Sequence, residues 1–235
     1  MSTPSADERE TQGLERTIFF SDAVIAIAMT LLALELPVPT QTAERTVWES
    51  FAHNFSNEYI SFLISFAVIG AFWFSHHRFF QDVARINHAL VFLNLLSLVA
   101  IVLVPFATKV LSVNNENSFG PMFYASVMVL FGLAYVLMVV AADRAGLWRE
   151  GTPPSAAGNK IFGISAALGI FALSIPLSFV DVNLAKLSWL LTPVVATVLP
   201  LLRARLRARV PARAPAPAPA PVGVANGARS DSGPP

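Results

Sequence analysis

Six apolar runs, each about long enough to cross a membrane as a helix, constrain the fold of this chain more than any other feature. A helix needs roughly 20 apolar residues to cross a hydrocarbon core of about 30 Å, and within lipid the backbone must satisfy its own hydrogen bonds. We therefore expect an all-α, polytopic membrane protein with six transmembrane helices. The runs cover residues 17–37, 59–75, 89–111, 120–142, 160–180 and 183–202.

The composition leaves room for one membrane domain and little else. Hydrophobic residues make up 54% of the 235 residues and charged residues 13%, whereas soluble domains are roughly 25% charged. The basic residues lie between the apolar runs, so they form no concentrated face for nucleic acid. The absence of cysteine excludes thiol chemistry and iron–sulfur clusters. We expect the lipid bilayer as a partner, no nucleic acid and no cofactor.

The distribution of Lys and Arg predicts the orientation. If both termini are cytoplasmic, all but three of the 16 Lys and Arg residues fall on the cytoplasmic side. Cytoplasmic loops of membrane proteins carry an excess of these residues, and an odd number of spans would remove the asymmetry. Six spans with both termini cytoplasmic are therefore predicted. The three outer residues are Arg45, Lys109 and Lys186.

The two ends of the chain differ in composition from the apolar runs. Residues 1–15 form a polar segment of mixed charge, unlike the apolar start of a secretory signal peptide. Residues 16–205 hold the six runs as one domain. Residues 206–235 form an Ala/Pro-rich tail that cannot bury apolar area, so we expect it to be disordered. The arginines of segment 203–209 are expected to face anionic lipid headgroups, with a nucleic-acid arm as the alternative.

An acidic residue, Asp22, lies in the first apolar run. It could cap a helix that begins at Ala23, but the 14 residues from there to Leu36 would span only about 21 Å. That length is shorter than the bilayer core. We therefore expect the helix to begin near Arg16, with Asp22 one to two turns inside. An ionised carboxylate at that depth costs several kcal/mol unless it is paired.

The second apolar run offers partners for this carboxylate, because it returns to the cytoplasmic face. Trp73 and His77 are four residues apart and share one helix face. They can offer an indole N–H and an imidazole to Asp22 and Ser21, while Arg16 adds a positive charge nearby. These residues predict a polar clasp between the first and second helices.

The residue types near Asp22 argue against two chemical alternatives to the clasp. Enzymatic use of Asp22 with His77 would need a nucleophile or a complete metal shell, and neither accompanies them, so we expect no enzyme. A metal site built from neighbouring histidines and an aspartate is a weak signal, because their spacing matches no ligand motif. The residues of that candidate site are His76, His77, His88 and Asp82.

An apolar stripe follows Asp22 on the first helix. Ile27, Thr30, Leu31 and Leu34 recur at i, i+3, i+4 and i+7, which places them on one face. Asp22 lies about 140° around the helix from Ile27, so the clasp and the stripe face different directions. Such a stripe either packs against neighbouring helices or lines a central pore, and the residues alone leave both interpretations open.

The start of the first helix resembles a known family. The R-x-x-x-F-S-D pattern is similar to the signature that opens the first helix of the transmembrane protein 175 potassium-channel family, and the resemblance extends over roughly residues 16–205. Animal members carry two six-helix repeats per chain, whereas this chain has room for one. The resemblance therefore implies a homotetramer around a central pore in a prokaryotic plasma membrane. The matching positions are Arg16, Phe20, Ser21, Asp22, Trp73 and His77.

The resemblance also implies roles for the stripe. It places the hydrophobic constriction of the pore at Ile27, continued by Leu31 and Leu34, with Thr30 at a hydroxyl-bearing position linked to potassium preference. Ala26 stands where some members have a serine. We therefore expect a cation channel with modest preference for potassium over other monovalent cations, and no bound ion beyond potassium in transit.

Two other functions remain as alternatives. A proton-coupled transporter could use Asp22 and His77, which would require alternating access and movement of the clasp. A non-conducting membrane scaffold is the second alternative. Single-channel currents in a reconstituted bilayer separate the three, because only a channel gives unitary conductance far above transporter turnover.

Overall fold

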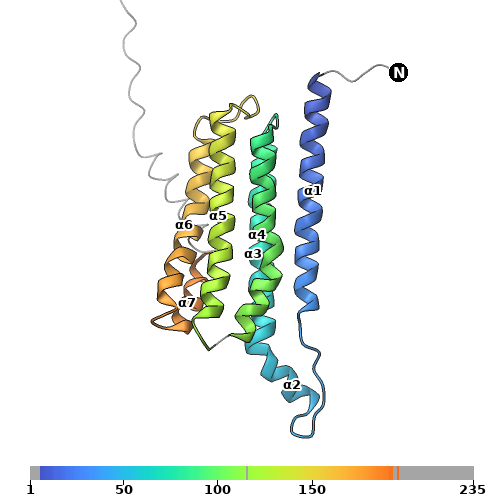
Figure 1. Cartoon of the computed structure of the whole chain (residues 1–235), viewed down its shortest axis with the longest axis vertical. Coiled ribbons are helices and arrows are strands. Elements are labelled where there is room, and N and C mark those ends of the chain that lie inside the picture. The colour runs from blue at the N-terminus through green and yellow to red at the C-terminus, as the bar shows by residue number, and fades with distance from the viewer. Residues whose placement is uncertain (1–5, 115, 193–194, 196–235) are drawn as a thin grey trace, which may run out of the picture.

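The computed structural model of this chain describes residues 6–114, 116–192 and 195. The described residues form helices and one isolated antiparallel bridge, and they contain no strand (Figure 1). The elements are α1 (Ala6–Leu34), α2 (Val47–Asn54), the π-helical segment η1 (Phe55–Tyr59), α3 (Ile60–Gln81), α4 (His88–Val113), α5 (Phe119–Arg144), α6 (Ala156–Leu177) and α7 (Val182–Ser188).

Five of the described helices are long and apolar enough to cross a membrane, namely α1, α3, α4, α5 and α6. The protein is thus an all-helical, multi-pass membrane protein. The sixth apolar run, 183–202, begins in the short helix α7, and most of its second half lies outside the described residues, as does the tail 206–235.

Two helices extend beyond the apolar runs that predicted them. The first helix begins at Ala6 rather than near Arg16, and α3 ends at Gln81 rather than at Ser75. Hydropathy marks where a helix enters lipid, whereas the helix itself can continue into water through residues of high helix propensity. The extensions are rich in Glu, Arg, Gln and Phe, and the first three of these have high helix propensity.

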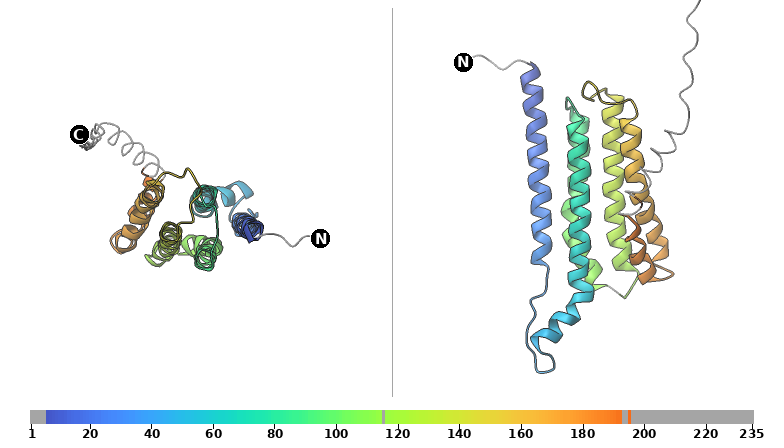
Figure 2. Two further views of the ribbon diagram at one scale, coloured as in Figure 1. Left: turned by 90° about the horizontal axis from the view of Figure 1, so that it is seen from above. Right: turned by 180° about the vertical axis from the view of Figure 1, so that it is seen from behind.

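The helices form an elongated bundle when seen from above (Figure 2). The first helix stands at one edge and contacts α3 and α4, while α6 stands at the opposite edge. In the middle, α5 packs against α4 on one side and α6 on the other. As a result, 56% of the apolar segment of α5 is buried, compared with 22% of that of α1.

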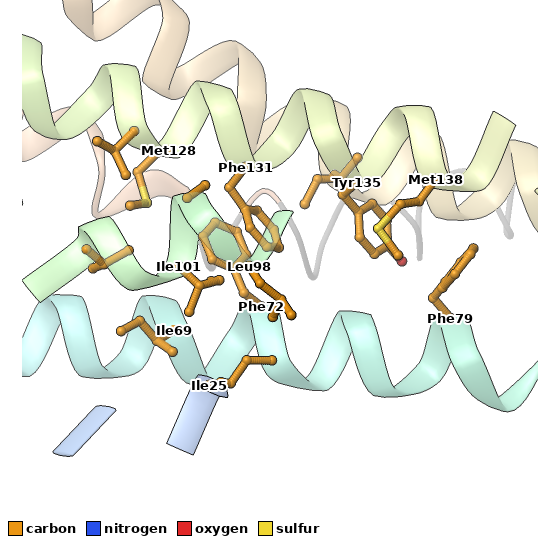
Figure 3. Packing of buried hydrophobic residues seen from close by; sticks show 14 of the residues in the cluster. Ile25, Ile69, Phe72, Phe79, Leu98, Ile101, Met128, Phe131, Tyr135 and Met138 are labelled. Atoms are coloured by element: carbon orange, nitrogen blue, oxygen red, sulfur yellow. The ribbon is translucent and has the colours of Figure 1, made fainter. Parts of the chain in front are cut away.

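Aromatic and aliphatic side chains of α3, α4 and α5 fill the middle of the bundle (Figure 3). Phe72 stacks on Phe131 with ring centroids 3.8 Å apart, and Ile69 and Ile101 are both nearly inaccessible. Because lipid tails are as apolar as these side chains, close packing rather than escape from water stabilises this contact.

Polar side chains also join these three helices near Pro105, which lies inside α4. The Thr108 hydroxyl oxygen lies 2.7 Å from the Ser65 hydroxyl oxygen and 2.8 Å from the Val104 carbonyl oxygen. The Ser65 hydroxyl in turn lies 3.2 Å from the Tyr124 hydroxyl. This buried cluster satisfies polar groups that lipid could not.

The loops α3–α4 and α5–α6 lie at the same end of the bundle as the start of α1 (Figure 1). They are tied together by the bridge between Val83 and Trp148 and by a hydrogen bond of 2.8 Å from Arg149 N to the Asp82 carbonyl. The Lys160 amine lies 2.8 Å from the Asp82 carboxylate. This is the predicted cytoplasmic end, and we call the other the predicted outer end.

Candidate functional site

The first helix has two faces with different surroundings. One face is buried against α3 and α4 and repeats at helical spacing, whereas the other is exposed in the single chain. A helix at an edge of a bundle must leave part of its circumference uncovered. The buried face consists of Leu14, Ser21, Ile25, Ala28 and Leu32.

The exposed face carries the predicted stripe Ile27, Thr30, Leu31 and Leu34, which we call the α1 stripe. Ile27 is 58% exposed and Leu34 is 78% exposed, while Ile25 on the other face is 2% exposed. The Thr30 hydroxyl donates to the Ile27 carbonyl over 2.8 Å. Its oxygen therefore keeps acceptor capacity that can face outward from the helix. The stripe is available to lipid or to other copies of the chain.

One hydrogen bond of the predicted polar clasp is present. The Trp73 indole N–H donates to Asp22 Oδ1 over 2.9 Å, which joins α3 to α1. The Asp22 side chain is half-buried, so this bond offsets part of the cost of holding a carboxylate among apolar neighbours.

The expected bond from His77 to Asp22 or Ser21 is not made, which corrects the sequence analysis. The His77 ring stacks on Trp73 with centroids 5.3 Å apart, and its Nε2 lies 3.0 Å from Gln81 Nε2. His77 lies one turn further along α3 than Trp73, the residue that bonds to Asp22. It lines instead an open cleft of about 470 Å³ at the predicted cytoplasmic end.

A second set of hydrogen bonds, which we call the buried network, joins Ser21, Asn94 and His76. The Asn94 amide donates to the Ser21 hydroxyl over 2.9 Å, and Asn94 Oδ1 lies 2.8 Å from His76 Nε2. The Ser21 hydroxyl donates to the Thr17 carbonyl over 2.8 Å. All three side chains are at most 2% exposed. The network therefore links α1, α4 and α3 in the interior.

Sequence reasoning missed Asn94 and chose the wrong one of two adjacent histidines. A signal for Asn94 existed, because it places an amide side chain within the apolar run 89–111, and such residues in membrane helices usually find a partner on a neighbouring helix. No signal in the sequence distinguishes His76 from His77, since that choice depends on the rotation of α3.

The remaining signature residues lie away from these bonds. Phe20 is 53% exposed on the outer surface of α1. Arg16 is also exposed, and the part of the chain that the structure describes offers it no ion pair. Neither residue belongs to the buried face of α1.

The histidines and aspartate weighed as a metal site do not come together. His76 is bonded to Asn94, and Asp82 pairs with Lys160. Within residues 6–114, 116–192 and 195, no group of three or more His, Cys, Asp or Glu side chains is arranged to hold a metal ion.

Comparison with known proteins places the same region in a family. The sequence model of the endosomal/lysosomal potassium channel TMEM175 matches residues 16–105, which contain the α1 stripe, the Trp73–Asp22 bond and the buried network. A potassium channel of Streptomyces collinus is 33% identical over 171 residues, covering 70% of this chain and 82% of the relative. A potassium channel of Chamaesiphon minutus is 31% identical over 186 residues, covering 76% and 89%.

A solved structure agrees with these relatives. The crystal structure of a lysosomal potassium-selective channel TMEM175 homologue from Chamaesiphon minutus is similar to this fold with a TM-score of 0.64 and 28% identity. The similarity covers 84% of this chain and 99% of that one.

Proposed function

This chain belongs to the family of the endosomal/lysosomal potassium channel TMEM175, and we propose that it is a potassium-preferring cation channel with an ion path lined by the α1 stripe. The observation that carries the proposal is the division of α1 into two faces. Polar bonds fix one face to the bundle, while the stripe on the other face is left uncovered. A homotetramer would bring four stripes together around a central axis.

The chemistry of the stripe suits a narrow hydrophobic constriction. A ring of four Ile27 side chains makes water unstable within it, so ions pass only when the ring is wide enough to stay wet. Thr30 lies about one turn away and adds hydroxyl oxygens that can replace part of an ion's hydration shell. The sequence lacks the T-V-G-Y-G carbonyl filter, and Ala26 offers no further hydroxyl. Potassium preference should therefore be modest.

The bonds on the other face of α1 give the ion path its fixed geometry. Apolar helices in lipid gain no hydrophobic energy from packing together, so directional hydrogen bonds contribute to fixing the rotation of a helix. The Trp73–Asp22 bond and the buried network hold α1 at one rotation. We infer that these residues act on conduction only indirectly, by holding the stripe toward the axis.

The topology proposed for this channel has six spans and cytoplasmic termini in a prokaryotic plasma membrane. Five spans are described, and the apolar run 183–202 supplies the sixth. Support for the orientation comes from the α3–α4 and α5–α6 loops, which lie at the end where α1 starts and contain Arg85 and Arg149, and from Lys160, which pairs with Asp82 of the first loop. The orientation assigns Arg45, Lys109 and Lys186 to the opposite end.

Recording from purified protein in planar bilayers tests the proposal. We expect unitary currents, a reversal potential shifted modestly toward potassium in mixed potassium and sodium solutions, and a particle of four chains in detergent. Flux coupled to a proton gradient without unitary current would indicate a transporter. Asp22 and His77, the residues expected to serve it, bond to Trp73 and Gln81 rather than to each other. A fully assembled protein without current would indicate a scaffold.

A further inference from the structure

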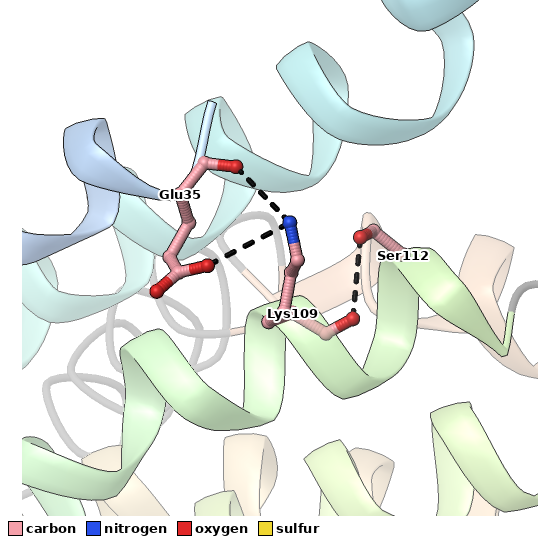
Figure 4. Close-up of polar contacts among 3 residues, drawn as sticks. All are labelled: Glu35, Lys109 and Ser112. Carbon is pink, nitrogen blue, oxygen red and sulfur yellow. Dashed lines mark hydrogen bonds and ion pairs between the residues drawn. The ribbon is translucent and has the colours of Figure 1, made fainter. Parts of the chain in front are cut away.

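A charged pair stands at the outer end of α1, immediately after the last residue of the α1 stripe (Figure 4). The amine of Lys109, on α4, lies 3.6 Å from the Glu35 carboxylate oxygen Oε2 and donates to the Glu35 main-chain carbonyl over 3.4 Å. One lysine therefore contacts both the acidic side chain and the backbone at the end of the helix.

The negative charge at the carbonyl end of α1 is compensated from another helix. The last turn of α1 contains no basic residue. The last two backbone hydrogen bonds join residues three apart: Glu35 N–H donates to the Leu32 carbonyl and Leu36 N–H to the Ala33 carbonyl, both over 3.3 Å. The carbonyl end of a helix carries about half a negative charge. Lys109 partly compensates that charge together with the charge of the Glu35 carboxylate.

The Glu35–Lys109 pair is too exposed to serve mainly in stabilising the contact between α1 and α4. The side chains of Lys109 and Glu35 are 44% and 46% exposed, and exposed ion pairs contribute little to stability. Charges in water at the rim of a narrow path do, however, change the local concentration of ions. Glu58 lines the same small cavity of about 10 Å³ as Glu35 and Lys109, so this corner holds two acids and one base.

We propose that the Glu35–Lys109 pair sets the electrostatic potential at the outer mouth of the ion path, and so the rate at which cations enter it from outside. This inference rests on the proposed function, in which four α1 ends surround that mouth. At 100° per residue, Glu35 lies about 80° around α1 from Ile27, beside the path rather than in it. It therefore acts through its field, with Lys109 lowering the net negative charge.

Unitary inward current at low and high salt tests this inference, because fields extend about 30 Å in 10 mM salt and only about 3 Å in 1 M salt. In 10 mM KCl, Glu35→Gln should reduce inward current roughly two- to threefold, whereas Lys109→Gln should raise it by a similar factor. In 1 M KCl both differences should disappear. Lys109→Arg, which keeps the charge, should behave as the parent.

The controls separate a field effect from a structural one. Glu150→Gln removes an exposed carboxylate at the opposite end of the bundle and should leave inward current unchanged. Changes of the same sign in Glu35→Gln and Lys109→Gln, or differences that persist in 1 M KCl, would overturn the inference in favour of a role in holding α1.

A parallel recording of Ile27→Ser distinguishes this inference from the proposed function. If that variant changes conductance while the charge variants leave inward current at the parental value in 10 mM KCl, only the inference fails. If Ile27→Ser conducts as the parent does, the assignment of the ion path to α1 fails, and the inference fails with it.

Discussion

The helices α1 and α5 are similar in sequence character and opposite in surroundings. Their apolar segments have mean hydropathies of 2.1 and 2.4, yet 22% of the first is buried compared with 56% of the second. Neighbours on two sides cover α5, whereas α1 has neighbours on one side only. More than half of the apolar segment of α5 thus lies in the core, whereas the proposed ion path is assigned to α1, which a single chain covers less.

The contacts that hold the two helices also differ. Stacked rings such as Phe72 and Phe131 and the buried Tyr124 hydroxyl hold α5, whereas α1 adds to its apolar buried face the Trp73–Asp22 bond and the buried network. Directional hydrogen bonds between helices contribute to fixing the rotation of a helix that has neighbours on one side only.

The largest effect is expected from Phe131→Ala in α5. Removing a ring that is 2% exposed leaves a cavity beside Phe72 and should lower the free energy of unfolding by about 3 kcal/mol. Denaturation of the purified protein in detergent measures it. Leu137→Ala, at a position of α5 that is 48% exposed, is the control. Equal losses from both would show that burial does not distinguish the two faces of α5.

His76→Ala should be the next most harmful change, because it leaves Asn94 buried without its partner. We expect a loss of about 2 kcal/mol in unfolding free energy and a lower yield of assembled oligomer. His77→Ala is the matched control on the adjacent residue and should cost much less, since the ring nitrogen of His77 is paired with the exposed Gln81 and its loss leaves no buried group without a partner. The opposite order would remove the buried network as the feature that holds α1.

Asp22→Ala should weaken assembly by about 1 to 2 kcal/mol and change ion preference little, because Asp22 accepts a bond from Trp73 away from the stripe. Asp22→Asn should also weaken it, but less, since the amide keeps an acceptor oxygen. Adding Trp73→Phe should cost less than the sum of the single changes. Normal assembly with altered selectivity would instead place Asp22 in the conduction path.

Ile27→Ser should raise unitary current roughly tenfold and reduce discrimination among monovalent cations, which corresponds to about 1.4 kcal/mol in the barrier. Ile25→Val on the buried face of α1 is the control. It should cost about 1 kcal/mol of stability and leave permeation as in the parent. Unchanged current in Ile27→Ser together with changed current in Ile25→Val would show that the wrong face had been assigned.

The smallest effect concerns α2, a peripheral helix in which no residue is buried. Hydrogen bonds from the Thr46 backbone N–H and hydroxyl hold the pKa of Glu49 below its ordinary 4.5. This capping box should stabilise α2 fully above the ordinary pKa and lose its effect as the pH falls through the lowered one. Hydrogen exchange of the α2 amides measures it, and Glu49→Gln should abolish the pH dependence.

Much of the fold and part of the site followed from the sequence. Five of the predicted apolar runs coincide with membrane-length helices, because crossing lipid requires a long apolar helix whatever its neighbours are. The bond between Asp22 and Trp73 was foreseeable because a carboxylate at that depth needs a partner, and the topology returns the second long helix to the same end.

What only the tertiary structure decided was the rotation of each helix. Adjacent residues point about 100° apart, so His76 faces the interior and bonds to Asn94 while His77 faces a cleft. Hydropathy cannot choose between them, because lipid and protein interior are equally apolar and leave no contrast around a membrane helix. The sequence determined that the apolar stripe and Asp22 lie on different sides of α1, whereas packing against α3 and α4 decided which side is covered.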